Sequence, residues 1–282
     1  MRIGIVAPST PILPETARRV TALAAEHFAG VELVFHPQCF LTHRHFAGED
    51  RLRADAFVEV ANDPGFDALW FARGGYGSCR IAEDVLARLA SAARDKAYLG
   101  YSDAGYMLAG LYRAGFPDLA HGPMPNDLRR DGGEAAVGRA LAWLTRRDAA
   151  TLEPSLGHEP AAAFNVTVFS QLLGTALEPD LAGHVLMLED VSEHMYRTDR
   201  ALFHITGNAA VRRVAGIRLG RCTEVPDNDP DFGASEEEVF RYWCDRSGIA
   251  WLGRADIGHD AGNKVVPFGR GVTTNRPAPG RG

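Results

Sequence analysis

The segment AYLGYSDAGYMLAGLYRAG, residues 97–115, passes from an apolar strand pattern into a helical pattern, with a serine and an aspartate at the junction. Backbone N–H groups at the start of a helix have no acceptor within it, so they suit a nucleophile that develops negative charge. Serine and aspartate are also preferred helix caps, and for this segment alone capping is the more common role of Ser102 and Asp103. The surrounding sequence has to decide between the two roles.

Strand and helix patterns alternate on both sides of this junction. Apolar runs at 2–8, 31–37, 67–72 and 97–102 are each followed by residues with helical spacing. Such alternation is typical of an α/β protein, in which a mostly parallel sheet carries helices on its faces. Ligands of open parallel sheets gather at the carboxyl ends of the strands. The glycine-rich segment ARGGYGSCR, residues 72–80, lies at such an end, as does the serine junction.

The pattern of the chain changes after residue 148. Residues 149–161 are interrupted by proline and glycine and lack a clear period, so they are the best candidate for a linker. Strand and helix patterns start again beyond it, which predicts an N-terminal α/β domain at 1–148 and a second domain at 162–270. The remaining residues, 271–282, are rich in glycine and proline, and we expect them to be disordered.

The composition indicates a soluble globular chain. Of its 282 residues 46% are hydrophobic, and the formal net charge is −6, which gives no basic surface for nucleic acid. No apolar run reaches the roughly 18–20 residues that span a bilayer, and the N-terminal segment is too short for a signal peptide. We therefore expect a cytoplasmic protein without nucleic-acid or membrane partners.

Neither the cysteines nor the histidine-rich segment predicts a metal site. The four cysteines form no CxxC pair, and we expect them to be reduced structural thiols. His36, His43 and His45 lie close together in the sequence, but their segment is loop-like and has no fourth ligand at a suitable spacing. We interpret it as a solvated loop.

The glycine-rich segment at 72–80 is open to two interpretations. Gly74, Gly75 and Gly77 do not fit the GxGxxG pattern of dinucleotide sites, and the segment lacks the lysine of a phosphate-binding loop. Paired glycines allow a backbone N–H to approach a ligand, and such a group would help to bind an oxyanion. An ordinary tight turn is about as consistent with the pattern.

A serine, a pair of carboxylates and a histidine each follow an apolar strand pattern. Ser102 ends the fourth run, Glu189 and Asp190 end HVLMLED, and His259 lies in a loop after a further strand. A nucleophilic serine needs a base, and the base needs an orienting carboxylate, so these residues are of the required types. Two observations weigh against this interpretation. GYSDAG departs by one residue from the GxSxG motif of α/β-hydrolases, and most single loop histidines lie at the surface.

Five segments taken together resemble a known family. They are ARGGYGS, GYSD, HGPM, LMLEDVSEHMYRTDR and IGHDAGNKVVPFG, and they occur in this order with compatible spacing. With the opening IGIVAPSTP they resemble the LD-carboxypeptidase family of serine peptidases, which includes muropeptide-recycling carboxypeptidases and microcin C immunity peptidases. The resemblance covers about residues 2–269. Each motif alone is weak, but the ordered set is specific.

The resemblance implies a fold and a catalytic triad. It implies an N-terminal parallel α/β domain that carries the nucleophile, a smaller β-rich C-terminal domain, and an active site at their interface. Ser102 is then the nucleophile, His259 the general base, and Glu189 the acid that orients the histidine. Glu193, four residues further on, is the alternative acid. We prefer Glu189 because the family's acid belongs to the ED pair at a strand end.

The same resemblance implies roles for groups around the triad. The Asp103 N–H and one N–H of the Gly74–Gly75 turn would form the oxyanion hole, with Asp103 also capping the helix. Arg73 and Arg80 are candidates for binding the substrate carboxylate, although Arg80 is equally consistent with a surface helix residue. No metal or organic cofactor is required, and a homodimer is implied by the resemblance alone.

Two positions depart from the family pattern. Ala104-Gly105-Tyr106 follow the SD pair, where members usually have an apolar residue and a threonine. Phe164-Asn165 stand where many members have Gly-Asn. Neither departure removes a triad residue, so we expect them to change the substrate pocket rather than the chemistry.

The expected activity is that of a cytoplasmic serine carboxypeptidase in peptidoglycan recycling. It would cleave the amide between an L-centre and a terminal D-amino acid, such as the D-alanine of a murein tetrapeptide, through an acyl-enzyme. One alternative is an immunity-type peptidase that cleaves an aminoacyl-nucleotide amide. Another is a non-catalytic protein that binds peptidoglycan fragments, and the presence of all three triad residues argues against it. Lysine and diaminopimelate are both candidates for the third residue of the peptide.

Overall fold

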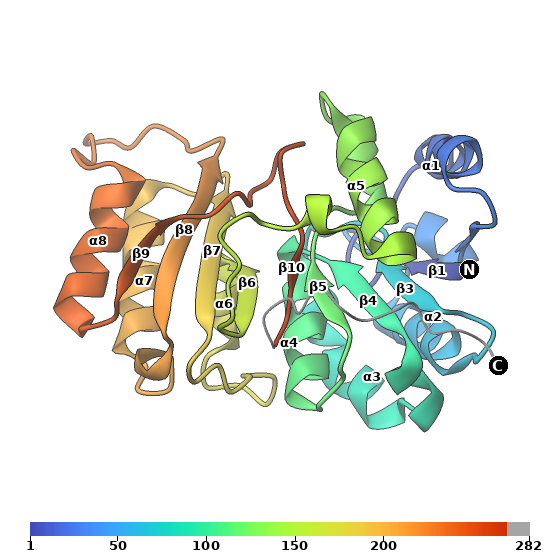
Figure 1. Cartoon of the computed structure of the whole chain (residues 1–282), viewed down its shortest axis with the longest axis horizontal. Helices are drawn as coiled ribbons and strands as arrows, with labels where there is room; N and C mark the ends of the chain where they lie inside the picture. The colour runs from blue at the N-terminus through green and yellow to red at the C-terminus, as the bar shows by residue number, and fades with distance from the viewer. Residues whose placement is uncertain (270–282) are drawn as a thin grey trace.

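Two sheets organise the chain, one in each half (Figure 1). The computed structural model describes residues 1–269, so the tail predicted at 271–282 lies outside the described residues. The strands of the first sheet are β1 (Arg2–Val6), β2 (Glu32–Phe35), β3 (Ala68–Phe71), β4 (Ala97–Gly100), β5 (Leu119–His121) and β10 (Val266–Pro267). Their order is β10-β5-β4-β3-β1-β2, and all neighbouring pairs are parallel except β10 and β5.

Helices cover both faces of the first sheet. They are α1 (Pro14–His27), α2 (Asp50–Asn62), α3 (Ala82–Arg88), α4 (Gly105–Arg113) and α5 (Gly133–Arg146). Figure 1 shows α1 and α5 on one face and α2, α3 and α4 on the other. Every residue of β3 and β4 is buried, as expected for parallel strands with helices on both sides. The alternation in the sequence therefore predicted this half of the molecule correctly.

The second sheet is also parallel. Its strands are β6 (Ala161–Asn165), β7 (Val185–Val191), β8 (Gly216–Thr223) and β9 (Trp251–Arg254), in this order. Its helices are α6 (Val166–Leu172), α7 (Met195–Gly207) and α8 (Glu236–Ser247). This domain is smaller than the first, as the family resemblance implied. It contains helices as well as strands, because neighbouring parallel strands need long crossover connections.

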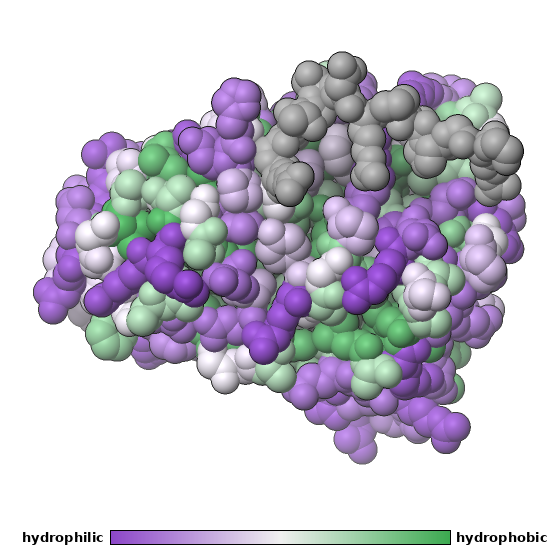
Figure 2. Space-filling view, turned by 60° about the horizontal axis from the view of Figure 1, so that its bottom comes forward, coloured by the Kyte–Doolittle hydropathy of each residue, from purple (hydrophilic) through white to green (hydrophobic). Residues whose placement is uncertain are grey.

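One of the buried apolar clusters spans both domains. Phe164 and Phe169 of the second domain belong to the same buried cluster as Met107 and Leu108 of α4. Hydrophilic side chains cover most of the face shown in Figure 2, with small apolar patches between them. None of the helices within residues 1–269 is long and apolar enough to cross a membrane. Cys39, Cys79, Cys222 and Cys244 are free thiols, as expected.

Within residues 1–269 the chain crosses between the domains twice. The segment predicted as a linker, 149–161, contains a short 3-10 helix, and its Leu152 pairs with Val265 in an isolated bridge. After the second sheet the chain returns, and β10 pairs antiparallel with β5 through Val266 and His121. The loop before β10, which carries His259, is therefore held between the two sheets.

Candidate active site

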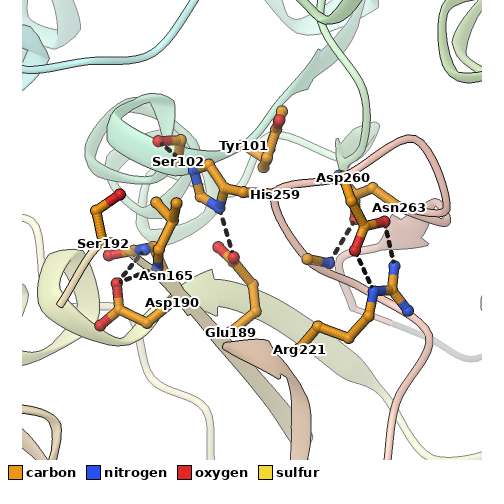
Figure 3. Close-up of polar contacts among 12 residues, drawn as sticks. Tyr101, Ser102, Asn165, Glu189, Asp190, Ser192, Arg221, His259, Asp260 and Asn263 are labelled. Carbon is orange, nitrogen blue, oxygen red and sulfur yellow. Dashed lines mark hydrogen bonds and ion pairs between the residues drawn. The ribbon is translucent and has the colours of Figure 1, made fainter. Parts of the chain in front are cut away.

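Ser102, Glu189 and His259 lie together where the two sheets meet (Figure 3). The Nε2 atom of His259 is 2.9 Å from Ser102 Oγ, and its Nδ1 atom is 2.5 Å from Glu189 Oε2. Nδ1 donates its proton to the carboxylate, so Nε2 of the neutral ring accepts a hydrogen bond from the serine hydroxyl. The three side chains form one continuous chain of hydrogen bonds although Ser102 and His259 are 157 residues apart.

The backbone at Ser102 is strained. Its φ is +60°, in the left-handed region that residues with a side chain rarely adopt. The strain occurs where β4 ends and a short 3-10 turn, Ser102–Ala104, leads into α4. A sharp turn of this kind lifts the serine side chain out of the sheet and exposes it at the strand end. The junction thus has the conformation of a nucleophile elbow although its sequence misses the common motif.

The glycine turn contacts the elbow directly. A Cβ atom at Gly74 would lie 2.8 Å from Ser102 Cβ and 3.4 Å from the backbone nitrogen of Asp103, so only glycine fits there. Gly75 has a φ of +104°, which also favours glycine. Within residues 1–269, neither the Gly75 N–H nor the Asp103 N–H donates a hydrogen bond to another residue. Two backbone donors that have no acceptor among the described residues therefore lie beside the elbow.

The side chain of Asp103 does not cap its own helix, which corrects the prediction from the sequence. The first turn of α4 has no side-chain cap. Instead, the buried carboxylate of Asp103 accepts hydrogen bonds from Ser9 Oγ and, at 2.8 Å, from the backbone nitrogen of Ser78. The Ser78 hydroxyl in turn donates to the Asp103 carbonyl at 2.5 Å. Because the elbow turns Asp103 inward, its side chain joins neighbouring segments instead of its own helix.

Glu189, not Glu193, contacts the histidine. Glu189 is fully buried, and its second oxygen, Oε1, has no hydrogen-bond partner among the described residues. Glu193 forms an ion pair with Arg197 at 3.6 Å. The next residue in the strand, Asp190, accepts hydrogen bonds from Asn165 and Thr167 instead. Burial and the nearby charge of Glu189 raise the pKa of Asp190 to about 6.

The imidazole of His259 is held in an environment that favours its protonated form. Burial lowers the pKa of His259, but the charge of Glu189 and its hydrogen bond outweigh this effect and raise the pKa above the ordinary value. The ring of Tyr101 packs against the imidazole with 4.8 Å between centroids, and its hydroxyl donates to Asp127 at 2.7 Å. These contacts fix the position of the ring, and sequence patterns did not indicate them.

The loop of His259 is braced on its other side. Asn263 Oδ1 accepts a hydrogen bond from the backbone nitrogen of Gly258 at 3.2 Å and lies 3.0 Å from His121 Nε2. Arg221 forms a bidentate ion pair with Asp260, the residue after His259 (Figure 3). Asn263 belongs to the IGHDAGNKVVPFG segment, but no role for it followed from the sequence. Its partner His121 is 142 residues away, so no local pattern reveals the contact.

The two arginine candidates differ in their surroundings. Arg80 forms an ion pair with Asp50 at 2.7 Å and lies over the ring of Phe46. Arg73, which precedes Gly74, is half-buried and donates a hydrogen bond of 3.0 Å to the carbonyl of Pro11. Its guanidinium has no carboxylate partner among residues 1–269. Burial and the neighbouring Arg129 charge lower its pKa. Of the two arginines, Arg73 is therefore the one that is more available to bind a substrate carboxylate.

The two departures from the family pattern contact each other. A Cβ atom at Gly105 would lie 3.3 Å from Phe164 and 3.0 Å from Val168. The small residue on α4 therefore makes room for the large residue on β6, across the interface between the domains. Phe164 in turn stacks on Phe169. The small side chain at Gly105 and the large side chain at Phe164 thus compensate each other in volume, next to the nucleophile elbow.

Among residues 1–269, no group of three or more histidine, cysteine, aspartate or glutamate side chains is placed to hold a metal ion. The chemistry of the arrangement is that of nucleophilic catalysis. The hydroxyl of Ser102, the imidazole of His259 and the buried carboxylate of Glu189 lie next to the two backbone donors described above. Groups of these types are suited to acyl transfer.

Comparison with known proteins assigns the family. Residues 3–122 match the LD-carboxypeptidase N-terminal domain, and residues 162–274 match the LD-carboxypeptidase C-terminal domain. The chain belongs to the LD-carboxypeptidase family. It is 25% identical over 288 residues to a murein tetrapeptide carboxypeptidase of Pseudomonas aeruginosa, a match that covers 95% of this chain and 91% of the relative.

Solved structures show the same fold. A muramoyltetrapeptide carboxypeptidase from Oxalobacter formigenes superposes with a TM-score of 0.78 at 22% identity, covering 94% of this chain and 93% of the other. The structure of MccF in complex with glutamyl sulfamoyl guanosine gives a TM-score of 0.77 at 18% identity, covering 95% and 91%. Both have the two-domain α/β architecture of this chain.

Proposed function

We propose that this chain is a serine-type LD-carboxypeptidase that releases the terminal D-alanine of murein tetrapeptides in the cytoplasm. The observation that carries the proposal is the hydrogen-bonded chain from Ser102 through His259 to Glu189 at the domain interface. Membership of the LD-carboxypeptidase family and the murein tetrapeptide carboxypeptidase of Pseudomonas aeruginosa support the substrate class.

The proposed reaction starts at Ser102. His259 Nε2 takes the hydroxyl proton while the serine oxygen attacks the carbonyl carbon that precedes D-alanine. The carbonyl oxygen becomes an oxyanion and accepts hydrogen bonds from the N–H groups of Gly75 and Asp103. His259 then gives its proton to the nitrogen of D-alanine, the amide bond breaks, and the peptide stays on the serine as an ester.

Water completes the cycle. His259 takes a proton from a water molecule, whose oxygen attacks the carbonyl carbon of the ester. The ester bond then breaks, His259 gives the proton to Ser102 Oγ, and the shortened peptide leaves with a new carboxyl group. Throughout these steps the positive charge of the imidazolium is stabilised by Glu189. Because Glu189 is fully buried, this interaction is weakened little by solvent.

We further propose that Arg73 binds the carboxylate of D-alanine. It adjoins the glycine turn and lacks an ion-pair partner among the described residues, whereas Arg80 pairs with Asp50, a carboxylate that also pairs with Arg53. Replacing Arg73 with glutamine should raise KM about 10-fold or more, because a charge-assisted hydrogen bond is lost. Arg80→Gln is the matched control, and a larger rise in KM for this variant would contradict the assignment.

The test is mass spectrometry of synthetic tetrapeptides that end in D-alanine, with lysine or diaminopimelate at the third position. We expect the wild type to remove one alanine and Ser102→Ala to remove none. A glutamyl sulfamoyl nucleoside is assayed in parallel. Cleavage of this conjugate alone would favour an immunity-type peptidase, and binding of tetrapeptide without cleavage would favour a non-catalytic protein. The homodimer stays a prediction, which sedimentation of the purified chain tests.

A further inference from the structure

Thr10 contacts the glycine turn that carries one of the proposed oxyanion donors. It lies in the loop after β1, is 6% exposed, and its Oγ1 donates a hydrogen bond of 2.7 Å to the carbonyl oxygen of Gly74. A trans peptide points its C=O and N–H in opposite directions, so this bond turns the N–H of Gly75 away from Thr10. The orientation of the Gly74–Gly75 peptide is thereby set by one buried hydroxyl.

Thr10 also limits the space of the turn. A Cβ atom at Gly75 would lie 2.7 Å from both Oγ1 and Cγ2 of Thr10. The neighbouring Gly74 approaches Ser102 as closely, since a Cβ atom there would lie 2.8 Å from Ser102 Cβ. The turn is therefore enclosed between Thr10 and the nucleophile elbow, and the hydroxyl of Thr10 supplies the polar contact that selects one peptide orientation.

Separate bonds hold the rest of this region. Ser9, next to Thr10, donates to the Asp103 carboxylate. The buried guanidinium of Arg53 donates to the carbonyls of Pro8 and, at 2.9 Å, Gly77. The loop after β1 and the glycine turn are thus tied together on both sides of the Thr10 contact. Loss of the Thr10 hydroxyl should leave both segments in place and free only the Gly74–Gly75 peptide to rotate.

We propose that Thr10 is a positioning residue for the oxyanion hole. Its hydroxyl holds the Gly75 N–H in the orientation in which it acts together with the Asp103 N–H on the developing oxyanion. The inference rests on the proposed function, because it assigns Thr10 a part in the same acyl-transfer site.

Thr10→Val removes the hydroxyl and keeps the shape of the side chain. We expect kcat for D-alanine release to fall about 10- to 100-fold and KM to change less than about threefold, because an oxyanion contact acts mainly in the transition state. Thr10→Ser keeps the hydroxyl and should restore kcat to within about threefold of wild type. Thr206→Val is the matched control: Thr206 is also buried and donates to a carbonyl, that of Leu202, but it lies in α7. Its kcat should equal that of the wild type.

A fluorophosphonate probe supplies a second readout that does not depend on the peptide. Its phosphoryl oxygen needs the same donors when Ser102 is labelled, so Thr10→Val should slow labelling and Thr206→Val should not. An undiminished kcat and labelling rate in Thr10→Val would overturn the proposal, as would an equal loss in Thr10→Ser. If the proposed function is wrong but the role of Thr10 is right, the result differs. The wild type would then release no D-alanine, while the probe would still label Thr10→Val more slowly than the wild type and Thr206→Val.

Discussion

Replacing Glu189 with glutamine removes a buried charge and keeps the size of the side chain. Glu189 is fully buried, and its only described polar partner is the His259 ring at 2.5 Å. Removing one member of a buried ion pair costs about 3–5 kcal/mol. During catalysis the imidazolium forms beside this residue, so we expect kcat to fall about 10²- to 10⁴-fold.

The pH profile should change in a defined direction. In the wild type, Glu189 outweighs the effect of burial and holds the pKa of His259 above 6.5. The reaction needs the neutral imidazole, so kcat/KM should rise with pH through this raised pKa. In Glu189→Gln the carboxylate charge is lost. Asp127 still raises the pKa of His259 and Arg130 still lowers it, but burial is then the largest effect and lowers the pKa, so the residual activity should reach its plateau at a lower pH than in the wild type.

The assay is D-alanine release measured from about pH 5 to pH 9 for both proteins. Glu193→Gln is the control, because Glu193 pairs with Arg197 and should affect neither the rate nor the profile. The reasoning would be refuted by a Glu189→Gln enzyme whose kcat stays within about threefold of wild type. An acid limb that does not move to lower pH would also refute it.

Two further predictions concern stability. Gly105→Thr should destabilise the fold by about 1–3 kcal/mol through overpacking against Phe164, and Phe164→Ala by about 3–5 kcal/mol. In chemical denaturation the double variant should lose less than the sum of the two, and strict additivity would show that the two positions do not compensate. Burial lowers the pKa of His121 to about 4, against 6.5 ordinarily, so the unfolded state binds the proton first as pH falls. The free energy of unfolding should therefore decline from pH 6.5 toward pH 4, and His121→Gln should flatten this slope in urea titrations. If the free energy of unfolding of His121→Gln depends on pH as strongly as that of the wild type, groups other than His121 cause the acid sensitivity.

The sequence predicted the features that depend on local patterns. Alternating apolar runs and helical spacing located β1 to β4 and the helices between them. The strand-end positions of Ser102 and Glu189 also followed from the sequence, because buried strands are visible as apolar runs. The assignment of His259 came from the family resemblance, since a single loop histidine has no distinguishing pattern.

Contacts between distant segments could not be predicted. Asp103 fits a helix cap by residue type, but the strained elbow at Ser102 turns it toward Ser9 and Ser78. The strand β10 has two residues, too few for a periodic signal. The packing of Tyr101 on His259 joins segments that no sequence pattern relates. Such contacts depend on the tertiary fold and become visible only with it.

The central claim is that Ser102 is the nucleophile of a carboxypeptidase. Its most direct test is mass spectrometry of the protein quenched during turnover of a tetrapeptide that ends in D-alanine. We predict a tripeptide ester on the fragment that contains Ser102, together with free D-alanine, and neither product with Ser102→Ala. Release of D-alanine by Ser102→Ala at the wild-type rate would contradict the account.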